Sequence, residues 1–293
     1  MLILPIANGN ILWYNIFVDG GNLYITMRVS YQTVVGVITT VTIDPFYVQI
    51  YKENNMNENI YDNETFFKKY SEMSRSKNGL AGAGEWTTLQ KILPDFYQKS
   101  VLDLGCGYGW HCRYAAEQGA KHVVGIDISQ KMIQTAKENR MESNIIYQCK
   151  AMEDLTLSGQ LFDVVMSSLA FHYVEDYEKM IQHIYEWLRP EGTLVFSTEH
   201  PVFTAYGSQD WIYNEQGEIL HFPVDNYYYE GWRDATFLGE KVKKYHRTVT
   251  TYLQTLLQTG FTLTHVIEPQ PPEGTLQDEM RRPMMLIVAA VKK

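Results

Sequence analysis

The sequence predicts an α/β fold built on one doubly wound sheet of seven strands, mostly parallel, with an antiparallel last pair. From Ser100 onward, apolar runs of strand length alternate with amphipathic stretches of helix length, which is typical of βαβ units around a parallel sheet. The last two apolar runs, residues 261–267 and 284–291, have no helix between them, so we expect them to pair antiparallel. A helical N-terminal cap and an aromatic-rich insertion complete the prediction.

The elements follow one another in a regular order. Residues 64–74 and 86–93 have helical spacing, and the glycines and alanines of residues 79–84 predict a hinge between them. In the sheet we predict strands, with helices between them, at residues 100–104, 122–127, 145–149, 162–167 and 193–197. Residues 199–240 form the insertion, and an amphipathic helix at residues 248–258 precedes the last two strands.

Residues 1–55 differ from the rest of the chain, because they carry few charges and many β-branched and aromatic side chains. They predict short strands or an irregular extension, with the clearest alternation at residues 33–43. This run is shorter than the roughly 20 apolar residues that span a bilayer, so we expect no membrane segment. We therefore divide the chain into an extension, residues 1–55, and one α/β domain, residues 56–293, which begins at a second plausible start, Met56.

The composition disfavours several classes of function. With 293 residues, 45% of them hydrophobic and 20% charged, the chain has the make-up of a globular protein. The formal net charge of -9 opposes attraction to nucleic acids and anionic membranes, so no nucleic-acid partner is expected. Cys106, Cys112 and Cys149 lack C-x-x-C spacing and no secretory signal precedes them, which favours a cytoplasmic location. The histidines and cysteines show no metal-ligand spacing, so no metal is expected.

Three glycines follow the first predicted strand of the sheet, at Gly105, Gly107 and Gly109. Glycine lets the backbone approach a ligand closely, and the helix that begins here directs free N–H groups toward it. Asp127 ends the next strand, about 20 residues later, where a carboxylate accepts hydrogen bonds from both hydroxyls of a ribose. We therefore predict a nucleoside ligand; a glycine turn that serves only packing is the alternative.

Residues 101–110, VLDLGCGYGW, resemble the first motif of class I S-adenosylmethionine-dependent methyltransferases. FDVVMSSLAFHYV and LRPEGTLVFS resemble the fourth- and fifth-strand regions of that family, and the similarity runs from about Tyr61 to the last residue. Trp110 stands where a dinucleotide fingerprint has its third glycine, which favours S-adenosylmethionine over NAD. EHPVFTA and KKYHRTVTTYL are similar to a bacterial group, methyltransferase type 11, assigned as small-molecule methyltransferases related to the ubiquinone/menaquinone type. The resemblance implies a Rossmann-like sheet.

The resemblance also implies roles for individual residues. Asp103 is expected near the methionine amino group, Asp127 at the ribose and residues 151–154 around the adenine. Arg75 is a candidate for the cofactor carboxylate. The predicted cofactor site as a whole comprises Tyr70, Arg75, Asp103, Gly105, Cys106, Gly107, Asp127, Ile128, Met132, Ala151, Met152, Glu153 and Ser168. A helix-capping or strand-end role for Asp103 and a surface salt bridge for Arg75 are the alternatives.

His172 and His200 are the candidate general bases. Methyl transfer from a sulfonium is an in-line displacement, so alignment is the main contribution of the protein, and a base is needed only for some acceptors. The two histidines follow the fourth and fifth strands, at the edge where open α/β sheets bind their ligands. A packing role is the alternative for each. We expect His200→Ala to lower turnover more than cofactor affinity.

Two clusters in the second half of the chain have two interpretations each. The insertion contains Phe203, Tyr206, Trp211, Tyr213, Phe222, Tyr227, Tyr228, Tyr229 and Trp232. Such a density is typical of an apolar lid over a substrate or of a hydrophobic cluster under a long loop. The basic run Lys241, Lys243, Lys244, His246 and Arg247 either attracts an anionic substrate or is a solvated face.

Three functions are consistent with these observations. The first is an enzyme, a monomer or homodimer, that methylates a small molecule with S-adenosylmethionine. The second is a nicotinamide-dependent oxidoreductase, which Trp110 and the antiparallel strand pair disfavour. The third is a module that binds S-adenosylmethionine without catalysis, and the sequence leaves it open.

Overall fold

The computed structural model describes residues 59–139, 142–157, 161–271 and 277–293, together with the backbone of four strands near the N-terminus. The chain forms two compact units, Met1–Glu58 and Asn59–Lys293. In the first unit, each strand pairs antiparallel with the next: β1 (Leu2–Ile6), β2 (Asn10–Asp19), β3 (Asn22–Ser30) and β4 (Thr40–Val41). Most of the alternating run that we expected at residues 33–43 lies outside the described residues.

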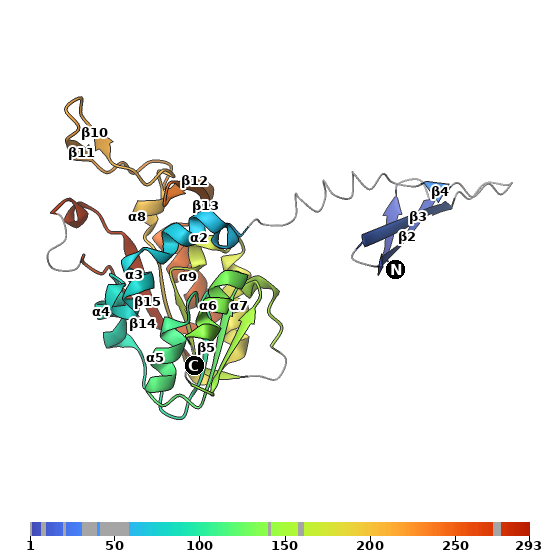
Figure 1. The fold of residues 1–293 in the computed structure, drawn as a ribbon, viewed down its shortest axis with the longest axis horizontal. Helices are drawn as coiled ribbons and strands as arrows, with labels where there is room; N and C mark the ends of the chain where they lie inside the picture. Colours follow the sequence, from blue (N-terminus) through green and yellow to red (C-terminus); the bar gives the residue numbers. More distant parts are fainter. Residues whose placement is uncertain are drawn as a thin grey trace. The chain divides into compact units, whose positions relative to one another are not determined.

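The second unit is built on a seven-stranded sheet in the order β14-β15-β9-β8-β5-β6-β7 (Figure 1). Its strands are β5 (Ser100–Leu104), β6 (His122–Asp127), β7 (Ile145–Cys149), β8 (Phe162–Ser168), β9 (Leu188–Glu199), β14 (Phe261–Ile267) and β15 (Met285–Lys292). The strands from β5 to β9 are parallel, whereas β15 pairs antiparallel with both β9 and β14. The predicted fold class is confirmed.

Helices cover both faces of this sheet because the strand side chains alternate. Val101 of β5 packs in a cluster with α5 (Trp110–Glu117) and α6 (Gln130–Glu138). Leu102 and Leu104 face the opposite cluster, which includes α7 (Tyr177–Trp187) and α9 (Val249–Thr259). β5 is therefore buried on both sides, as its apolar run predicts. Among the residues that the structure describes, no helix is long and apolar enough to span a bilayer.

Three element boundaries differ from the sequence-based expectation. The first expected helix is divided into α2 (Glu64–Ser71) and α3 (Ser74–Lys77) by the extended backbone of Met73. The second consists of α4 (Trp86–Leu89) and a single 3-10 turn, η3 (Gln90–Ile92), and it ends before Pro94, which disfavours a helical predecessor. The glycine hinge forms another 3-10 helix, η2 (Gly79–Gly82).

The N-terminal helices and the insertion meet above one end of the sheet (Figure 1). The insertion contains α8 (Pro201–Thr204), the strand pair β10 (Ile212–Tyr213) and β11 (Ile219–His221), and most of the ribbon β12 (Gly231–Phe237) and β13 (Glu240–His246). Phe66 of α2 packs on Phe237, with 5.8 Å between ring centroids, and Lys69 Nζ lies 2.9 Å from Glu240 Oε1. The cap and the insertion therefore form one covering layer.

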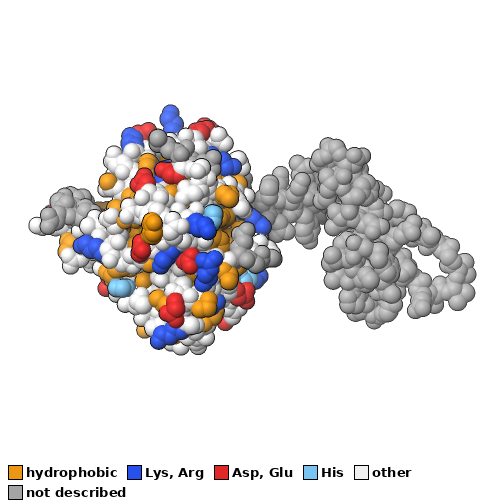
Figure 2. Space-filling view, turned by 90° about the horizontal axis from the view of Figure 1, so that it is seen from below, with side chains coloured by type: hydrophobic (Ala, Val, Ile, Leu, Met, Phe, Trp, Pro, Cys, Tyr) orange, Lys and Arg blue, Asp and Glu red, His pale blue; other side chains and the backbone are white. Residues whose placement is uncertain are grey.

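The face seen in Figure 2 carries acidic and basic side chains interspersed with apolar ones. The excess negative charge of the chain is therefore not gathered into one patch on this face. An interspersed surface of this kind favours solubility over steering of a strongly charged partner.

Candidate active site

The glycine turn after β5 is tied directly to the end of β6. The backbone N–H groups of Gly105 and Cys106 both donate to Ile126 O, at 2.8 and 2.9 Å. Gly107 N donates to Asp127 Oδ2 at 2.8 Å. The two strand ends that the sequence singled out are thus adjacent in space.

The glycines of this turn are needed for different reasons. Gly105 has a φ of +75°, and a Cβ there would lie 2.4 Å from Ala170 Cβ, which is too close for any side chain. Gly107 has a φ of +52°, but a Cβ there would meet nothing within 4 Å. The backbone at Gly107 therefore borders open space where a ligand fits closely.

Asp127 has acceptor capacity left for a ligand. Its Oδ1 accepts from Ser129 N at 2.9 Å and its Oδ2 from Gly107 N, and each carboxylate oxygen has a second lone pair. Burial raises the pKa of Asp127 to about 6. At neutral pH the group is therefore an anionic acceptor of the kind that binds the two hydroxyls of a ribose.

Asp62 was missed by the sequence analysis and lies beside this site. It is in the 3-10 turn η1 (Ile60–Asp62) and accepts from Ser129 Oγ at 2.7 Å and Lys131 N at 3.0 Å. It thereby binds N–H groups at the start of α6 that have no partner within the helix. No local sequence pattern indicates this contact, because its partners are 67 and 69 residues away.

A cavity beside the glycine turn brings together part of the predicted cofactor set. It encloses about 460 Å³, including the part open to solvent. The predicted residues that line it are Tyr70, Arg75, Gly105, Cys106, Gly107 and Ser168. Further lining residues, which the sequence analysis did not assign to the cofactor, are Ser76, Gly79, Leu80, Ala83, Tyr108, Trp110 and His111.

The other predicted cofactor residues lie elsewhere. Ile128, which follows Asp127, is 45% exposed, whereas Met132 is only 2% exposed and belongs to the interior. Ala151 precedes a 3-10 turn, Met152–Asp154, after β7, and this turn contains both Met152 and Glu153. Burial raises the pKa of Glu153. Their roles at the adenine stay predictions.

Asp103 is buried behind the turn. It is 1% exposed, its Oδ2 accepts from Cys112 Sγ at 3.2 Å, and it is not among the residues that line the cavity. Burial raises the pKa of Asp103 to about 7. Its expected contact with the methionine amino group stays a prediction.

Arg75 forms an ion pair, but not the surface salt bridge that was the alternative. It pairs with Glu85, a carboxylate that is only 1% exposed. Ser168 Oγ, at the end of β8, also donates to Glu85 Oε1, at 3.0 Å. Sequence analysis missed Glu85, which is a single acidic residue after a glycine-rich stretch and matches no motif considered there.

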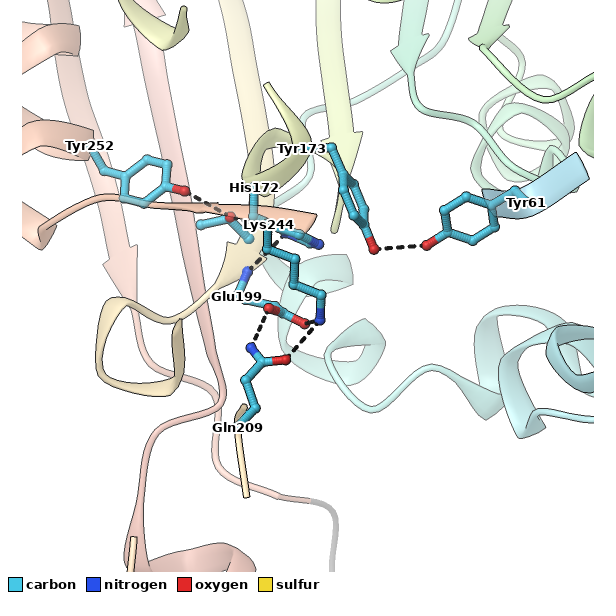
Figure 3. Close-up of polar contacts among 8 residues, drawn as sticks. Tyr61, His172, Tyr173, Glu199, Gln209, Lys244 and Tyr252 are labelled. Atoms are coloured by element: carbon cyan, nitrogen blue, oxygen red, sulfur yellow. Dashed lines mark hydrogen bonds and ion pairs between the residues drawn. The ribbon is translucent and has the colours of Figure 1, made fainter. Parts of the chain in front are cut away.

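His172 is buried beside two paired tyrosines. Its Nδ1 accepts from Glu199 N at 3.4 Å, and its ring lies against that of Tyr173 with 4.4 Å between centroids. The hydroxyls of Tyr173 and Tyr61 point toward one another at 2.9 Å (Figure 3). Burial lowers the pKa of His172 to about 4, so the ring is neutral at physiological pH.

His200 has both ring nitrogens in contact with other groups. Nδ1 accepts from Val202 N at 3.1 Å and so caps the start of α8. Nε2 lies 2.8 Å from Glu268 Oε1. Neither His200 nor His172 is among the residues that line the cavity, and the two candidate bases differ in their partners: His172 lies beside Tyr173, whereas His200 caps α8.

Comparison with known proteins identifies the family. The model of a methyltransferase domain matches residues 102–196. A solved structure from Listeria monocytogenes, assigned to the S-adenosylmethionine-dependent methyltransferases, is 53% identical; the match covers 72% of this chain and 98% of that one, with a TM-score of 0.69. The chain belongs to the S-adenosylmethionine-dependent methyltransferases. The family and the cofactor that the sequence predicted are thereby confirmed.

Two further similarities agree with this assignment. The structure of an S-adenosylmethionine-dependent methyltransferase from Mesorhizobium loti is 40% identical, with 73% of this chain and 100% of that chain covered and a TM-score of 0.68. Over 110 residues, this methyltransferase is 38% identical to a ubiquinone biosynthesis O-methyltransferase from Coxiella burnetii, of which the match covers 47%.

The basic run of this methyltransferase is not uniformly solvated. It lies on β13, where Lys241 and Lys243 are exposed while Lys244 is 3% exposed. Lys244 Nζ donates to Glu199 Oε1 at 2.6 Å and to Gln209 Oε1 at 2.9 Å. Gln209 Nε2 closes the ring by donating to Glu199 Oε2 at 2.7 Å (Figure 3).

His246 and Arg247 are buried as well. His246 lies 2.7 Å from Thr204 Oγ1, and Arg247 donates to Glu175 O at 2.7 Å. The interpretation of the run as a solvated face is therefore wrong for Lys244, His246 and Arg247: strand alternation directs Lys244 and His246 inward, and Arg247, just after β13, is buried as well.

The aromatic side chains of the insertion form two groups. Phe203, Trp211 and Phe222 surround the Arg282 guanidinium, whose carbon lies 4.3 Å from the Trp211 ring centroid. In contrast, Tyr228 and Tyr229 are 88% and 74% exposed. The first group is a packed cluster under the loop, and the second remains available at the surface.

Proposed function

We propose that this protein transfers a methyl group from S-adenosylmethionine to a small-molecule acceptor bound next to the glycine turn. The observation that carries the proposal is the 2.8 Å hydrogen bond between Gly107 N and Asp127, beside a cavity whose wall includes Arg75. A nucleoside that bears a zwitterionic tail needs an acceptor for its hydroxyls, a close backbone approach and a cation for its carboxylate. This set of residues offers all three.

In this proposal, Asp127 binds the ribose, and Ile128, Met152 and Glu153 border the adenine. Tyr70, Arg75, Cys106 and Ser168 surround the tail, in the cavity that they line. When bound, the cofactor supplies an electrophilic methyl group on a sulfonium. The electron-rich faces of nearby aromatic rings stabilise such a cation.

We place the acceptor against His172, Tyr173 and Tyr61. Because Nδ1 of His172 accepts a hydrogen bond from Glu199 N, the neutral ring carries its proton on Nε2 and donates it. His172 thus donates a hydrogen bond that orients an oxygen or nitrogen of the acceptor. In this state it does not take a proton from the acceptor. The paired hydroxyls of Tyr173 and Tyr61 add two groups that donate or accept.

The domain assignment is part of the same proposal. Residues 56–293 form the catalytic domain, and residues 199–240 act as a lid that excludes water from the acceptor. The likeness to an O-methyltransferase of ubiquinone biosynthesis supports a small organic acceptor. Three free cysteines, two of them buried, fit a reducing cytoplasm.

Calorimetric titration with S-adenosylmethionine, S-adenosylhomocysteine and NADH tests the proposal, followed by a methyl-donor assay over a panel of phenols, hydroxy acids and amines. We expect binding of the two sulfur nucleosides and turnover of at least one acceptor class. Binding of NADH alone would overturn the assignment. Binding of S-adenosylmethionine without turnover of any acceptor would favour a non-catalytic module.

A further inference from the structure

Glu85 is a buried carboxylate with an incomplete set of partners. Its Oε1 accepts from Arg75 and from Ser168 Oγ, whereas its Oε2 is buried and has no hydrogen-bond partner among the described residues. Burial raises the pKa of Glu85, but the Arg75 charge and hydrogen bonds outweigh this and lower it overall. A buried anion is therefore held at the edge of the cofactor cavity.

Both groups that Glu85 holds are exposed to that cavity. Arg75 and Ser168 line it, and the Arg75 side chain remains 22% exposed although one of its nitrogens is bound to Glu85. A guanidinium has five N–H donors in a planar fork, so the contacts of Arg75 with Glu85 and Tyr70 leave other donors for a ligand. Glu85 holds one nitrogen of that fork.

The cavity wall also contains a charged side chain, Arg75, which the binding of a neutral nucleoside does not require. The tail of the cofactor is an amino acid with one carboxylate and one ammonium group. Asp103, the residue expected at the ammonium group, is 1% exposed and does not line the cavity. The charged side chain of the proposed tail site that does line the cavity is Arg75, which suits the tail carboxylate and is held by Glu85.

We infer that Glu85 is a positioning residue for the amino-acid tail of the cofactor. It holds the Arg75 guanidinium so that the free edge of the fork donates to the tail carboxylate, and it holds the Ser168 hydroxyl next to it. The inference rests on the proposed function, because it assumes that this cavity takes S-adenosylmethionine. A purely architectural role, which joins α3 to the start of α4, is the competing explanation.

The two explanations differ in which ligand is affected. S-adenosylhomocysteine carries the tail, whereas 5′-methylthioadenosine has the same adenosine and thioether without it. We expect Glu85→Gln to weaken binding of S-adenosylhomocysteine by about tenfold or more and to leave binding of methylthioadenosine unchanged. Glu72→Gln is the matched control: Glu72 forms an exposed ion pair with Lys77, so its loss should affect neither ligand.

These titrations distinguish a positioning role of Glu85 from an architectural one. Equal weakening of both ligands, or of neither, would overturn the inference in favour of the architectural role. If Glu85→Gln does not fold, as judged by its thermal transition, Glu85→Asp takes its place, because it keeps the buried charge but is one methylene shorter and so shifts the Arg75 fork; the same selective loss is expected. If the unmodified protein binds neither ligand, the proposed function itself fails, and the inference falls with it.

Discussion

Asp127 combines two properties that make its protonation state measurable. It is buried, which raises its pKa to about 6, and it has lone pairs that we assign to the ribose hydroxyls. Since the native pKa lies above the unfolded value, the unliganded protein loses stability from this group as the pH rises from about 4 to 6, and the loss is complete above 6. Ligand binding has the opposite dependence, because only the carboxylate accepts from both hydroxyls.

We therefore predict that affinity for S-adenosylhomocysteine rises with pH below about 6 and is level above it. Asp127→Asn should weaken binding by roughly 10- to 100-fold at pH 7.5 and remove the pH dependence. Calorimetry between pH 5 and 8 measures both. A level profile for the unmodified protein would contradict the assignment of Asp127.

The two histidines lead to different expectations. His200 caps α8 and contacts Glu268, so His200→Ala should lower the free energy of unfolding by about 1 kcal/mol in urea titration. We therefore predict that loss of stability accompanies any loss of turnover in this variant. His172→Ala should lower kcat at least tenfold with little change in cofactor affinity. A larger kcat loss in the His200 variant would restore it as the acid–base group.

Residues of the site were predictable when their role follows from a local motif. Gly105, Gly107 and Asp127 were found because a strand end and a glycine turn are visible in the sequence. Asp62 and Glu85 were not, since each acts on groups brought close only by the fold. The placement of Lys244 was missed for the same reason: its charge is satisfied by Glu199, 45 residues away.

At the scale of elements, the strands were predictable and the ends of the helices less so. Apolar runs such as residues 100–104 are buried on both faces, and this burial fixes them as strands. β9 is longer than expected, because it begins at Leu188 and passes through Pro190 and Gly192, which favour a loop. The break between α2 and α3 has no glycine or proline to mark it.

The glycine turn gives a matched pair of variants. Gly105→Ala places a Cβ 2.4 Å from Ala170 Cβ at a positive φ, so we expect it to lower the free energy of unfolding by about 3 kcal/mol. Gly107→Ala meets no atom within 4 Å, so it should cost only about 1 kcal/mol for the backbone conformation.

The affinity for the cofactor product should also distinguish Gly105→Ala from Gly107→Ala. Gly107→Ala is expected to remain folded and to lose affinity for S-adenosylhomocysteine, because its methyl group occupies open space that we assign to the cofactor. Thermal unfolding and calorimetry on both proteins check this. If Gly107→Ala bound the nucleoside as tightly as the unmodified chain, the cofactor would have to lie elsewhere.

At the scale of the whole molecule, the α/β unit has its own cores on both faces of the sheet. We therefore predict that a chain beginning at Met56 has the same midpoint of thermal unfolding for this unit and the same affinity for S-adenosylhomocysteine as the full chain. Calorimetry on the two proteins measures both quantities. A loss of affinity in the shorter chain would show that residues 1–55 contribute to the site.

The ring of Lys244, Glu199 and Gln209 has a consequence for how this chain can change over generations. Loss of one charge leaves the other buried and uncompensated, which is more harmful than exchanging both for apolar side chains. Descendants that alter the acceptor side should therefore replace these positions together. We therefore expect the residues of the covering layer and those at the strand end beneath it to be substituted together.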